Sequence, residues 1–192
     1  YSILYADPPY YSGNTKNLNG HFRGIAERHY KTMKLDELKA LDVESISNDD
    51  CYLLMWTTSP FLQKAFEIIN SWGFKYSTVA FVWIKSRNDG NGIRTDGLGK
   101  YTISNAEYCL VSRKGKYWRE AKNVQQVVIS PKEKHSKKTD EVRKRIVKIS
   151  KMAGDLVYCV AILGITGSSS AARDGLNSYL TKVRENSKCP YV

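Results

Sequence analysis

Short runs of apolar residues recur along the chain, separated by segments that are polar or carry apolar residues at helical spacing. The runs have the length of strands rather than of buried helices, and several are bounded by Gly, Pro, Asn or Asp. Six strands are expected, at residues 2–6, 51–56, 75–84, 105–112, 124–130 and 155–165. The last is almost wholly apolar, so it is predicted to be buried on both faces.

Three helices are expected where Leu, Ile, Val, Phe or Trp recur every three or four residues. They fall at residues 35–41, 60–72 and 140–151. Ser59 is predicted to cap the second helix and Pro60 to take its first helical position, and the helix should end before Gly73. Residues 11–30 and 86–100 are rich in Gly and Asn and show no clear period, so loops are expected there, the second one mobile.

The alternation of strands and helices predicts an α/β domain with a largely parallel sheet. With 192 residues, 42% of them hydrophobic, the chain can build one core but hardly two, so residues 1–192 are interpreted as a single domain. Apolar runs do not exceed about eight residues, which excludes a membrane-spanning helix.

Four cysteines without a Cys-x-x-Cys pair predict neither a disulfide framework nor a zinc site. Cys51, Cys109 and Cys159 lie within apolar runs, so buried thiols in a reducing compartment are expected. The expected location is the cytoplasm, or the nucleoid or nucleus if a partner directs the chain there. The three histidines lie far apart in the sequence, and no metal site is expected.

Positive charge is concentrated in one stretch. The net charge is +11, and residues 113–151 hold 14 Lys and Arg against 4 Asp and Glu. In the helix expected at 140–151, Val142, Ile146 and Ile149 line one face and basic residues the other. Such a stretch is either a solvated helix face or a contact surface for nucleic acid. Because the charge is concentrated rather than spread, we favour nucleic acid.

The tetrapeptide Asp7-Pro8-Pro9-Tyr10 directly follows the first predicted strand, and ligands of open α/β sheets bind at the carboxyl ends of strands. The exocyclic amino group of a nucleobase is a poor nucleophile because its lone pair is delocalised into the ring. The Asp7 carboxylate and the Pro8 carbonyl can accept its two N–H groups and stabilise the charge that develops on nitrogen. Tyr10 can stack on a base that has left its duplex. A purely structural turn would use the same residues.

Several other segments accompany the tetrapeptide in a fixed order. They are His29–Met33, Tyr52–Thr58, Trp72–Phe74, Val82–Lys85, Gly97–Tyr101 with Asn105–Val111, and His135–Glu141. Together they resemble the MT-A70 family of adenine N6-methyltransferases, whose catalytic motif is Asp-Pro-Pro-aromatic. Tyr10 stands where the family usually has Trp, and Thr139 where it has Pro.

The resemblance implies a Rossmann-like methyltransferase fold, with a mostly parallel central sheet flanked by helices. The motif order would be permuted, with the catalytic motif before the cofactor strand. The implied reaction is methyl transfer from S-adenosylmethionine to adenine N6 in nucleic acid, with DNA expected rather than RNA. A homo- or heterodimer is compatible with it, and cytosine N4 transfer would use the same tetrapeptide.

The resemblance also implies roles for individual residues. Asp7 and Pro8 would hold the amino group, Tyr10 would pack on adenine, and Asp7 and Pro9 would line the cofactor. Lys138 matches a lysine beside the cofactor's carboxylate, although by itself it would be one more solvated lysine of the basic stretch.

Two residues of the segment that closes over the target base are implied to bind substrate, namely Glu107 and Asn105. Without the resemblance, a single strand glutamate such as Glu107 would be interpreted as a surface residue. Trp56 and Trp83 are expected in the core rather than stacked on a base.

The chain departs from the family pattern near its end. Gly154-Asp155-Leu156 is present, but Val157–Gly164 lacks the Glu and Arg of the family's cofactor strand. Asp174–Thr181 is a reduced version of the next motif and lacks its terminal Asn. The alternative function is therefore a catalytically inactive nucleic-acid-binding subunit that supports an active partner.

Overall fold

The computed structural model describes residues 1–11, 13, 32–96, 99, 101–116, 121–132, 138–150 and 156–160. The strands in these ranges are β1 (Ile3–Asp7), β2 (Cys51–Thr57), β3 (Lys75–Ser86), β4 (Ala106–Lys114), β5 (Val127–Pro131) and β6 (Leu156–Val160). The α-helices are α1 (Leu35–Lys39), α2 (Leu62–Ser71) and α3 (Asp140–Ser150), and the 3-10 turns are η2 (Glu44–Ile46) and η3 (Ser59–Phe61). Predictions for residues 14–30, 133–137 and 161–192 lie outside the described residues.

The strands form one sheet in the order β5-β3-β4-β2-β1-β6. Strand β1 is parallel to β2 and β6, and β3 is parallel to β5, whereas β4 is antiparallel to both of its neighbours. A parallel β4 would need a crossover, usually a helix, and the described residues between β3 and β4 form none. The expected α/β fold, with a mostly parallel sheet flanked by helices, is confirmed with β4 as the exception.

In this topology, the strand ends that carry the predicted site residues lie at one edge of the sheet, which we call the site edge. The carboxyl ends of β1, β2 and β3 lie there together with the amino end of β4, as the pairs Ala6–Met55, Thr57–Tyr108 and Trp83–Glu107 show. Asp7 ends β1, the strand between β2 and β6. The tetrapeptide therefore begins at the site edge on the second-last strand of the sheet, at a carboxyl strand end, where an open α/β sheet binds its ligands.

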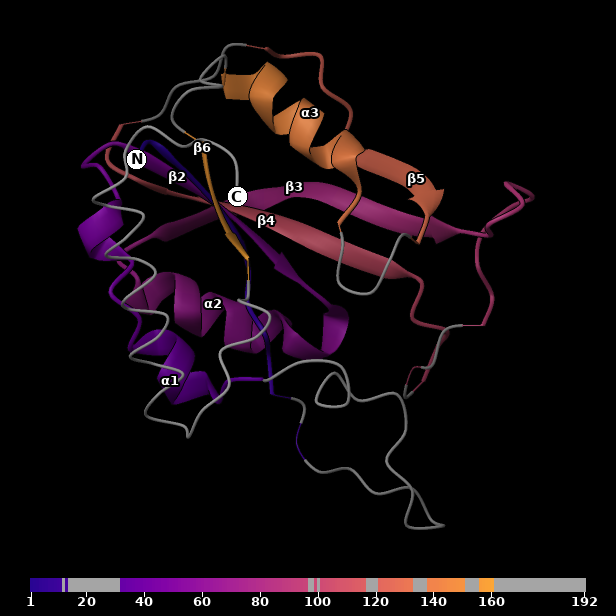
Figure 1. Ribbon diagram of the computed structural model, residues 1–192, viewed down its shortest axis with the longest axis horizontal. Helices are drawn as coiled ribbons and strands as arrows, with labels where there is room; N and C mark the ends of the chain where they lie inside the picture. The colour runs from indigo at the N-terminus through magenta and orange to yellow at the C-terminus, as the bar shows by residue number, and fades with distance from the viewer. Residues whose placement is uncertain are drawn as a thin grey trace.

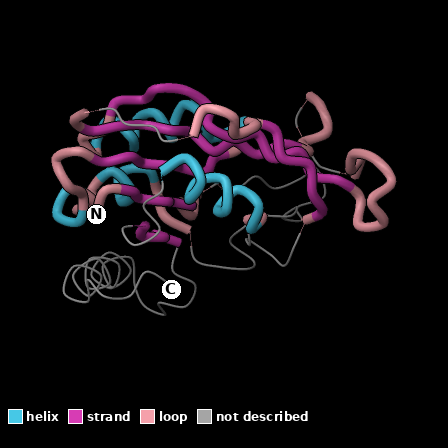
Figure 2. Tube along the Cα trace, turned by 90° about the horizontal axis from the view of Figure 1, so that it is seen from above, coloured by secondary structure: helices cyan, strands magenta, loops and turns pink. Residues whose placement is uncertain are grey.

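Helices cover both faces of the sheet. Helices α1 and α2 lie on one face and α3 on the other (Figure 1), and the view from above shows α3 on the near side of the strands (Figure 2). On the α3 face, Val142 and Ile146 are buried as predicted, while Ile149 is half-buried. Trp56 and Trp83 are each 1% exposed, which confirms them as core residues. Fully burying a side chain of this kind stabilises the fold by about 2–3 kcal/mol.

The start of α2 differs from the prediction. Thr58, not Ser59, is the residue before the first turn, and Ser59–Phe61 is a 3-10 turn from which α2 begins at Leu62. Pro60 lies in this turn because its missing N–H costs nothing there. The predicted end is confirmed, since Gly73 has φ of 78°, a left-handed conformation that glycine adopts without strain.

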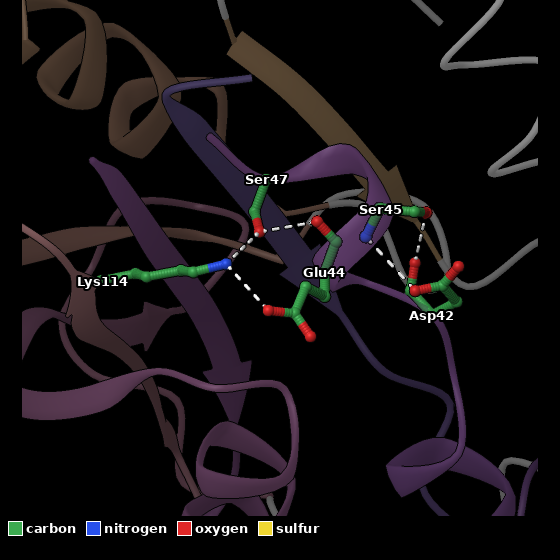
Figure 3. A network of polar contacts seen from close by, with 5 residues as sticks. All are labelled: Asp42, Glu44, Ser45, Ser47 and Lys114. Atoms are coloured by element: carbon green, nitrogen blue, oxygen red, sulfur yellow. Dashed lines mark hydrogen bonds and ion pairs between the residues drawn. The ribbon is translucent and has the colours of Figure 1, made fainter. Parts of the chain in front are cut away.

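Two further boundaries also differ. The strand predicted at 124–130 begins only at Val127. Just before it, the side chain of Gln126 donates to the carbonyl of Val79 at 2.6 Å. Strand β4 runs on to Lys114, and its end is tied to η2 at the edge opposite the site (Figure 3). There Lys114 Nζ lies 3.3 Å from Glu44 Oε1 and 3.4 Å from Ser47 Oγ.

No helix in the part of the chain that the structure describes is long and apolar enough to cross a membrane. Cys51 and Cys109 are buried free thiols, as predicted.

Candidate active site

The backbone of the tetrapeptide is braced from two sides. The N–H of Tyr10 donates to the Pro8 carbonyl at 3.0 Å, which folds the chain back directly after β1. Met33 donates its N–H to the Pro9 carbonyl at 2.8 Å and accepts from the N–H of Tyr11 at 3.0 Å. Both prolines are buried. Because a carbonyl oxygen has two lone pairs, Pro8 retains acceptor capacity beyond its bond to Tyr10.

Four charged side chains meet at the site edge on the α3 face. Lys138, which precedes α3, places Nζ 2.9 Å from Asp7 Oδ2 and 3.2 Å from Glu107 Oε2. Lys85, near the end of β3, places its own Nζ 2.5 Å from Glu107 Oε1. All four side chains are only 12–17% exposed. We call Asp7, Lys85, Glu107 and Lys138 the charge cluster.

Trp56 forms the floor of the charge cluster. It ends the apolar part of β2, which lies between the strands of Asp7 and Glu107. The ammonium of Lys138 lies 5.6 Å from the centre of its ring, within the range of a cation–π contact. Lys138 thus spans β2 from above and joins two carboxylates that the sheet holds apart.

Burial and pairing act in opposite directions on these groups. Burial raises the pKa of the Asp7 carboxyl, and Lys138 opposes that effect only in part. For Glu107 burial also favours the neutral form, but Lys138 and Lys85 together bring its pKa below the usual value. Burial alone would lower the pKa of Lys138, yet Asp7 and Glu107 raise it above its ordinary value. The cluster therefore has a firmly charged lysine between two carboxylates of different basicity.

Tyr10 lies beside this cluster with its ring on Phe61. The two ring centres are 4.9 Å apart and the rings are nearly parallel, at 10°. The Tyr10 hydroxyl donates to the Trp56 carbonyl at 3.1 Å, and burial raises its pKa, so it remains protonated at neutral pH. Lys64 Nζ lies 5.3 Å from the centre of the Phe61 ring. An aromatic pair with a nearby cation is a surface on which a base and its phosphate can bind.

A pocket of about 420 Å³ lies between η3 and the residues that lead into β4. It is lined by Ser59, Pro60, Tyr101, Thr102, Ile103, Ser104, Asn105, Ala106 and Tyr108. Ser59 and Pro60 directly precede Phe61, and Asn105 and Ala106 directly precede Glu107. The mixture of aromatic, apolar and hydroxyl side chains, and a volume within the range of ligand pockets, suit a nucleobase.

The structure brings together most of the predicted site residues. Asp7, Glu107 and Lys138, distant in sequence, form one cluster of contacts, and Tyr10 lies at the same edge. Asn105 is separate from this cluster: it lines the pocket, and its side chain donates to the Arg94 carbonyl at 3.2 Å. In the described part of the chain, no group of three or more His, Cys, Asp or Glu side chains is arranged to hold a metal ion.

Two contributors were missed by sequence reasoning. Lys85 was noted only as part of the Trp-x-Lys segment, and Phe61 was assigned to no site. Lys85 follows the apolar part of β3, and Phe61 lies in η3, four residues after β2 ends. The rule that ligands bind at strand ends was therefore the available signal for both. Their side-chain partners depend on strand order, which the sequence pattern does not determine.

The chain matches the sequence model of the MT-A70 family over residues 1–157. It is 40% identical over 164 residues to the Type II methyltransferase M.MunI of Mycoplasma sp., covering 78% of this chain and 67% of that protein. It is 28% identical over 115 residues to the human N(6)-adenosine-methyltransferase catalytic subunit METTL3, covering 60% and 17%. A probable N(6)-adenosine-methyltransferase of rice is 26% identical over 150 residues, covering 78% and 19%.

The chain thus spans about two thirds of the bacterial relative but only about a fifth of the rice and human ones. The family match includes the tetrapeptide, the Trp-x-Lys segment and the segment of Lys138. With more than half of its length matched, this chain belongs to the MT-A70 family.

Proposed function

We propose that this chain transfers the methyl group of S-adenosylmethionine to N6 of adenine in DNA. The observation that carries the proposal is the Asp7 carboxylate, only 14% exposed, at the end of β1, next to the Pro8 carbonyl and at the same sheet edge as the aromatic pair Tyr10–Phe61. Two acceptors at this point match the two N–H groups of an adenine amino group. Tyr10 and Phe61 offer the flat surface that its ring needs.

The charge cluster fits the methionine end of S-adenosylmethionine. That part of the molecule carries a sulfonium cation, an ammonium and a carboxylate. Asp7 and Glu107 supply negative charge for the cations, and Lys138 and Lys85 supply ammonium groups for the carboxylate. When bound, the cofactor supplies a methyl group on positively charged sulfur that is open to attack by a nucleophile. The segment that matches the family's cofactor strand, Val157–Gly164, is described only as far as residue 160.

In the transfer itself, the Asp7 carboxylate and the Pro8 carbonyl act on the target amino group. By accepting the N–H groups, Asp7 and Pro8 draw the amino nitrogen toward tetrahedral geometry and make its lone pair available. A nitrogen–carbon bond forms as the sulfur–carbon bond breaks, and the electron pair of the broken bond remains on sulfur. The nitrogen then carries a positive charge, which the Asp7 carboxylate stabilises. One N–H proton passes to Asp7, whose pKa is raised by burial, and from there to water.

The basic stretch supports nucleic acid as the substrate. On α3, Arg143, Lys144 and Lys148 are exposed, opposite the buried Val142 and Ile146. Arg145, which is half-buried, is bound to Glu141 at 2.9 Å and to the carbonyls of residues 125 and 127 at 2.7 and 2.8 Å. The exposed residues are suited to phosphate contacts, which would make binding strongly dependent on salt.

DNA is favoured over RNA because identity is higher to the bacterial Type II methyltransferase than to the N(6)-adenosine-methyltransferases. The inactive-subunit alternative is not favoured, because the tetrapeptide is intact and its carboxylate lies in an ordered cluster of charges. The relatives named METTL3 are described as subunits, so pairing with a second chain belongs to the proposal. The proposed location is the cytoplasm, or the nucleoid or nucleus through a partner.

The test is transfer of a radioactive methyl group from S-adenosylmethionine to DNA and RNA of the same adenine-containing sequences. The product is digested to nucleosides and separated by chromatography. Label in N6-methyldeoxyadenosine is expected. Label in N4-methyldeoxycytidine would show that the target base is cytosine rather than adenine. Label in RNA alone would show that the substrate is RNA rather than DNA. No label in any product would refute the proposed activity.

A further inference from the structure

Lys85 was considered above only as a source of positive charge for the cofactor, yet four contacts converge on it. Its ammonium pairs with Glu107 Oε1 at 2.5 Å and lies 5.5 Å from the centre of the Trp83 ring. Its backbone N–H donates to the Asn105 carbonyl at 2.8 Å, and its carbonyl accepts from the N–H of Arg94 at 2.8 Å. Lys85 therefore connects the charge cluster with the strand that lies next to the pocket.

The ion pair between Asp7 and Lys138 creates a competition. Lys138 occupies Oδ2 of Asp7 at 2.9 Å, one of the two oxygens with which Asp7 accepts hydrogen bonds. An amino group can bind Asp7 beside Lys138, but an ammonium held at 2.9 Å offsets the negative charge that has to stabilise the reacting nitrogen, so Asp7 acts best once Lys138 has moved away. Because Lys138 is only 12% exposed, solvent does not readily take over its charge, and a second carboxylate is needed. Glu107 Oε2, 3.2 Å away, is that carboxylate.

We propose that Lys85 is a positioning residue that fixes Glu107, so that Lys138 can pass from Asp7 to Glu107 when the target amino group arrives. Lys85 holds Oε1, which leaves Oε2 directed at Lys138. The inference rests on the proposed function, since it requires Asp7 to accept the amino group of the base.

The positive charge of Lys85 also keeps Glu107 ionised, in addition to fixing the position of its carboxylate. A buried glutamate that faces a single shared cation takes up a proton more readily than one that faces two. Protonated Glu107 is a poor acceptor for an ammonium, so Lys138 would remain on Asp7 and offset the charge with which Asp7 stabilises the reacting nitrogen. The groups facing the cluster among the described residues are Asp7 from β1, Tyr10 after it, Lys85 from β3, Glu107 and Cys109 from β4, and Lys138 before α3.

The experiment compares kcat and KM for DNA methylation across pH in the wild type and in Lys85→Met, Lys85→Arg and Glu107→Gln. Lys85→Met should lower kcat at neutral pH by about tenfold or more, the scale of a misplaced catalytic group. KM for DNA should change little. The acid limb of kcat should move to higher pH, so that activity recovers as the pH is raised. Lys85→Arg keeps the charge and should restore most of the rate.

Glu107→Gln resembles a glutamate that is permanently protonated, so its kcat should be low at every pH, with no recovery in base. The matched control is Lys114→Met at the opposite edge of the sheet (Figure 3). Lys114 has a comparable exposure, 22%, and also pairs with a glutamate, Glu44, although that side chain is 79% exposed. Lys114 lies seven residues from Glu107 along β4, about 24 Å away. Its pH profile should match that of the wild type.

An unmoved acid limb in folded Lys85→Met, or a Lys85→Arg variant as slow as Lys85→Met, would overturn the inference. Thermal unfolding will show whether Lys85→Met folds. If it does not fold, Glu107→Gln is the deciding variant, and a wild-type rate in that variant also overturns the inference. These results differ from failure of the proposed function, in which the wild type itself transfers no methyl group; that result removes both proposals.

Discussion

Replacing Tyr10 separates the work of its ring from that of its hydroxyl. The ring stacks on Phe61 at 4.9 Å, and the hydroxyl donates to the Trp56 carbonyl at 3.1 Å. Tyr10→Phe removes only the hydrogen bond, whereas Tyr10→Ala removes the ring as well. If the ring is what binds the base, the two variants must differ in their affinity for substrate.

The magnitudes follow from these contacts. Loss of one half-buried hydrogen bond should cost Tyr10→Phe about 1 kcal/mol of stability. For a chain of this length that lowers Tm by about 2–4 °C. Loss of an aromatic stacking surface costs about 1–3 kcal/mol of base binding. Tyr10→Ala should therefore weaken substrate binding by about 5- to 150-fold, because each 1.4 kcal/mol is a factor of about ten.

The assay is titration of an adenine-containing oligonucleotide into each variant by fluorescence anisotropy, with calorimetric Tm measured alongside. Tyr10→Phe should bind within about twofold of the wild type, since its ring surface is intact. Equal loss of affinity in Tyr10→Phe and Tyr10→Ala would show that the hydroxyl, not the ring, contacts the substrate. Unchanged affinity in both would remove Tyr10 from the substrate site.

Three further predictions concern stability and reactivity. Gly73→Ala should lower the free energy of unfolding by about 1–2 kcal/mol, because a φ of 78° lies in the left-handed region that a side chain disfavours. Denaturant unfolding measures this loss. Gly73→Asn should lose less stability, because asparagine adopts that region more readily than alanine. Glu107 has a lowered pKa, so its ion pairs stabilise above the ordinary carboxyl value of 4.5 and are lost as the pH falls through the folded pKa. As the pH is lowered from 6, the free energy of unfolding should therefore fall less in Glu107→Gln than in the wild type. Asp7 has a raised pKa, so its protonation favours the folded state at low pH, and this contribution is present in both proteins. Burial raises the pKa of Cys51 to about 11 and also raises that of Cys109, so iodoacetamide at pH 8 should leave both unlabelled in the native protein; rapid labelling seen by mass spectrometry would contradict their burial.

Strand and helix positions were largely predictable because hydrophobic period and length decide them locally. Strand β2 and helix α1 lie where short-range patterns place them, and α2 ends before Gly73 as expected. The predicted start of α2 was wrong because Ser59 and Pro60, which precede Leu62, are compatible with more than one capping geometry. A choice between such geometries is made by tertiary contacts rather than by propensity.

Strand direction was only partly predictable. Nothing in the composition of β4 distinguishes a strand that runs antiparallel to its neighbours from one that runs parallel to them. Yet that reversal brings the amino end of β4, with Glu107, to the same edge as the carboxyl end of β1, with Asp7. The cluster around Lys138 depends on it.

The residues of the site were predicted, but their contacts were not. Asp7 and Pro8 could be derived from the chemistry of an amino group, whereas Glu107 and Lys138 required the resemblance to a family. A lysine in a basic stretch has no local signal that it will be buried between two carboxylates. That Lys138 pairs with Asp7 itself could be learned only from the structure.

The central claim is that the Asp7 carboxylate prepares the amino group for attack, and Asp7→Asn tests it most directly. Asparagine keeps the shape and one acceptor oxygen but removes the negative charge. Under single-turnover conditions with saturating cofactor and DNA, the transfer rate should fall by about 10²–10³-fold, the loss expected when electrostatic stabilisation is removed. Calorimetry should show the variant folded and still binding S-adenosylmethionine. A transfer rate within a few-fold of the wild type would contradict the account.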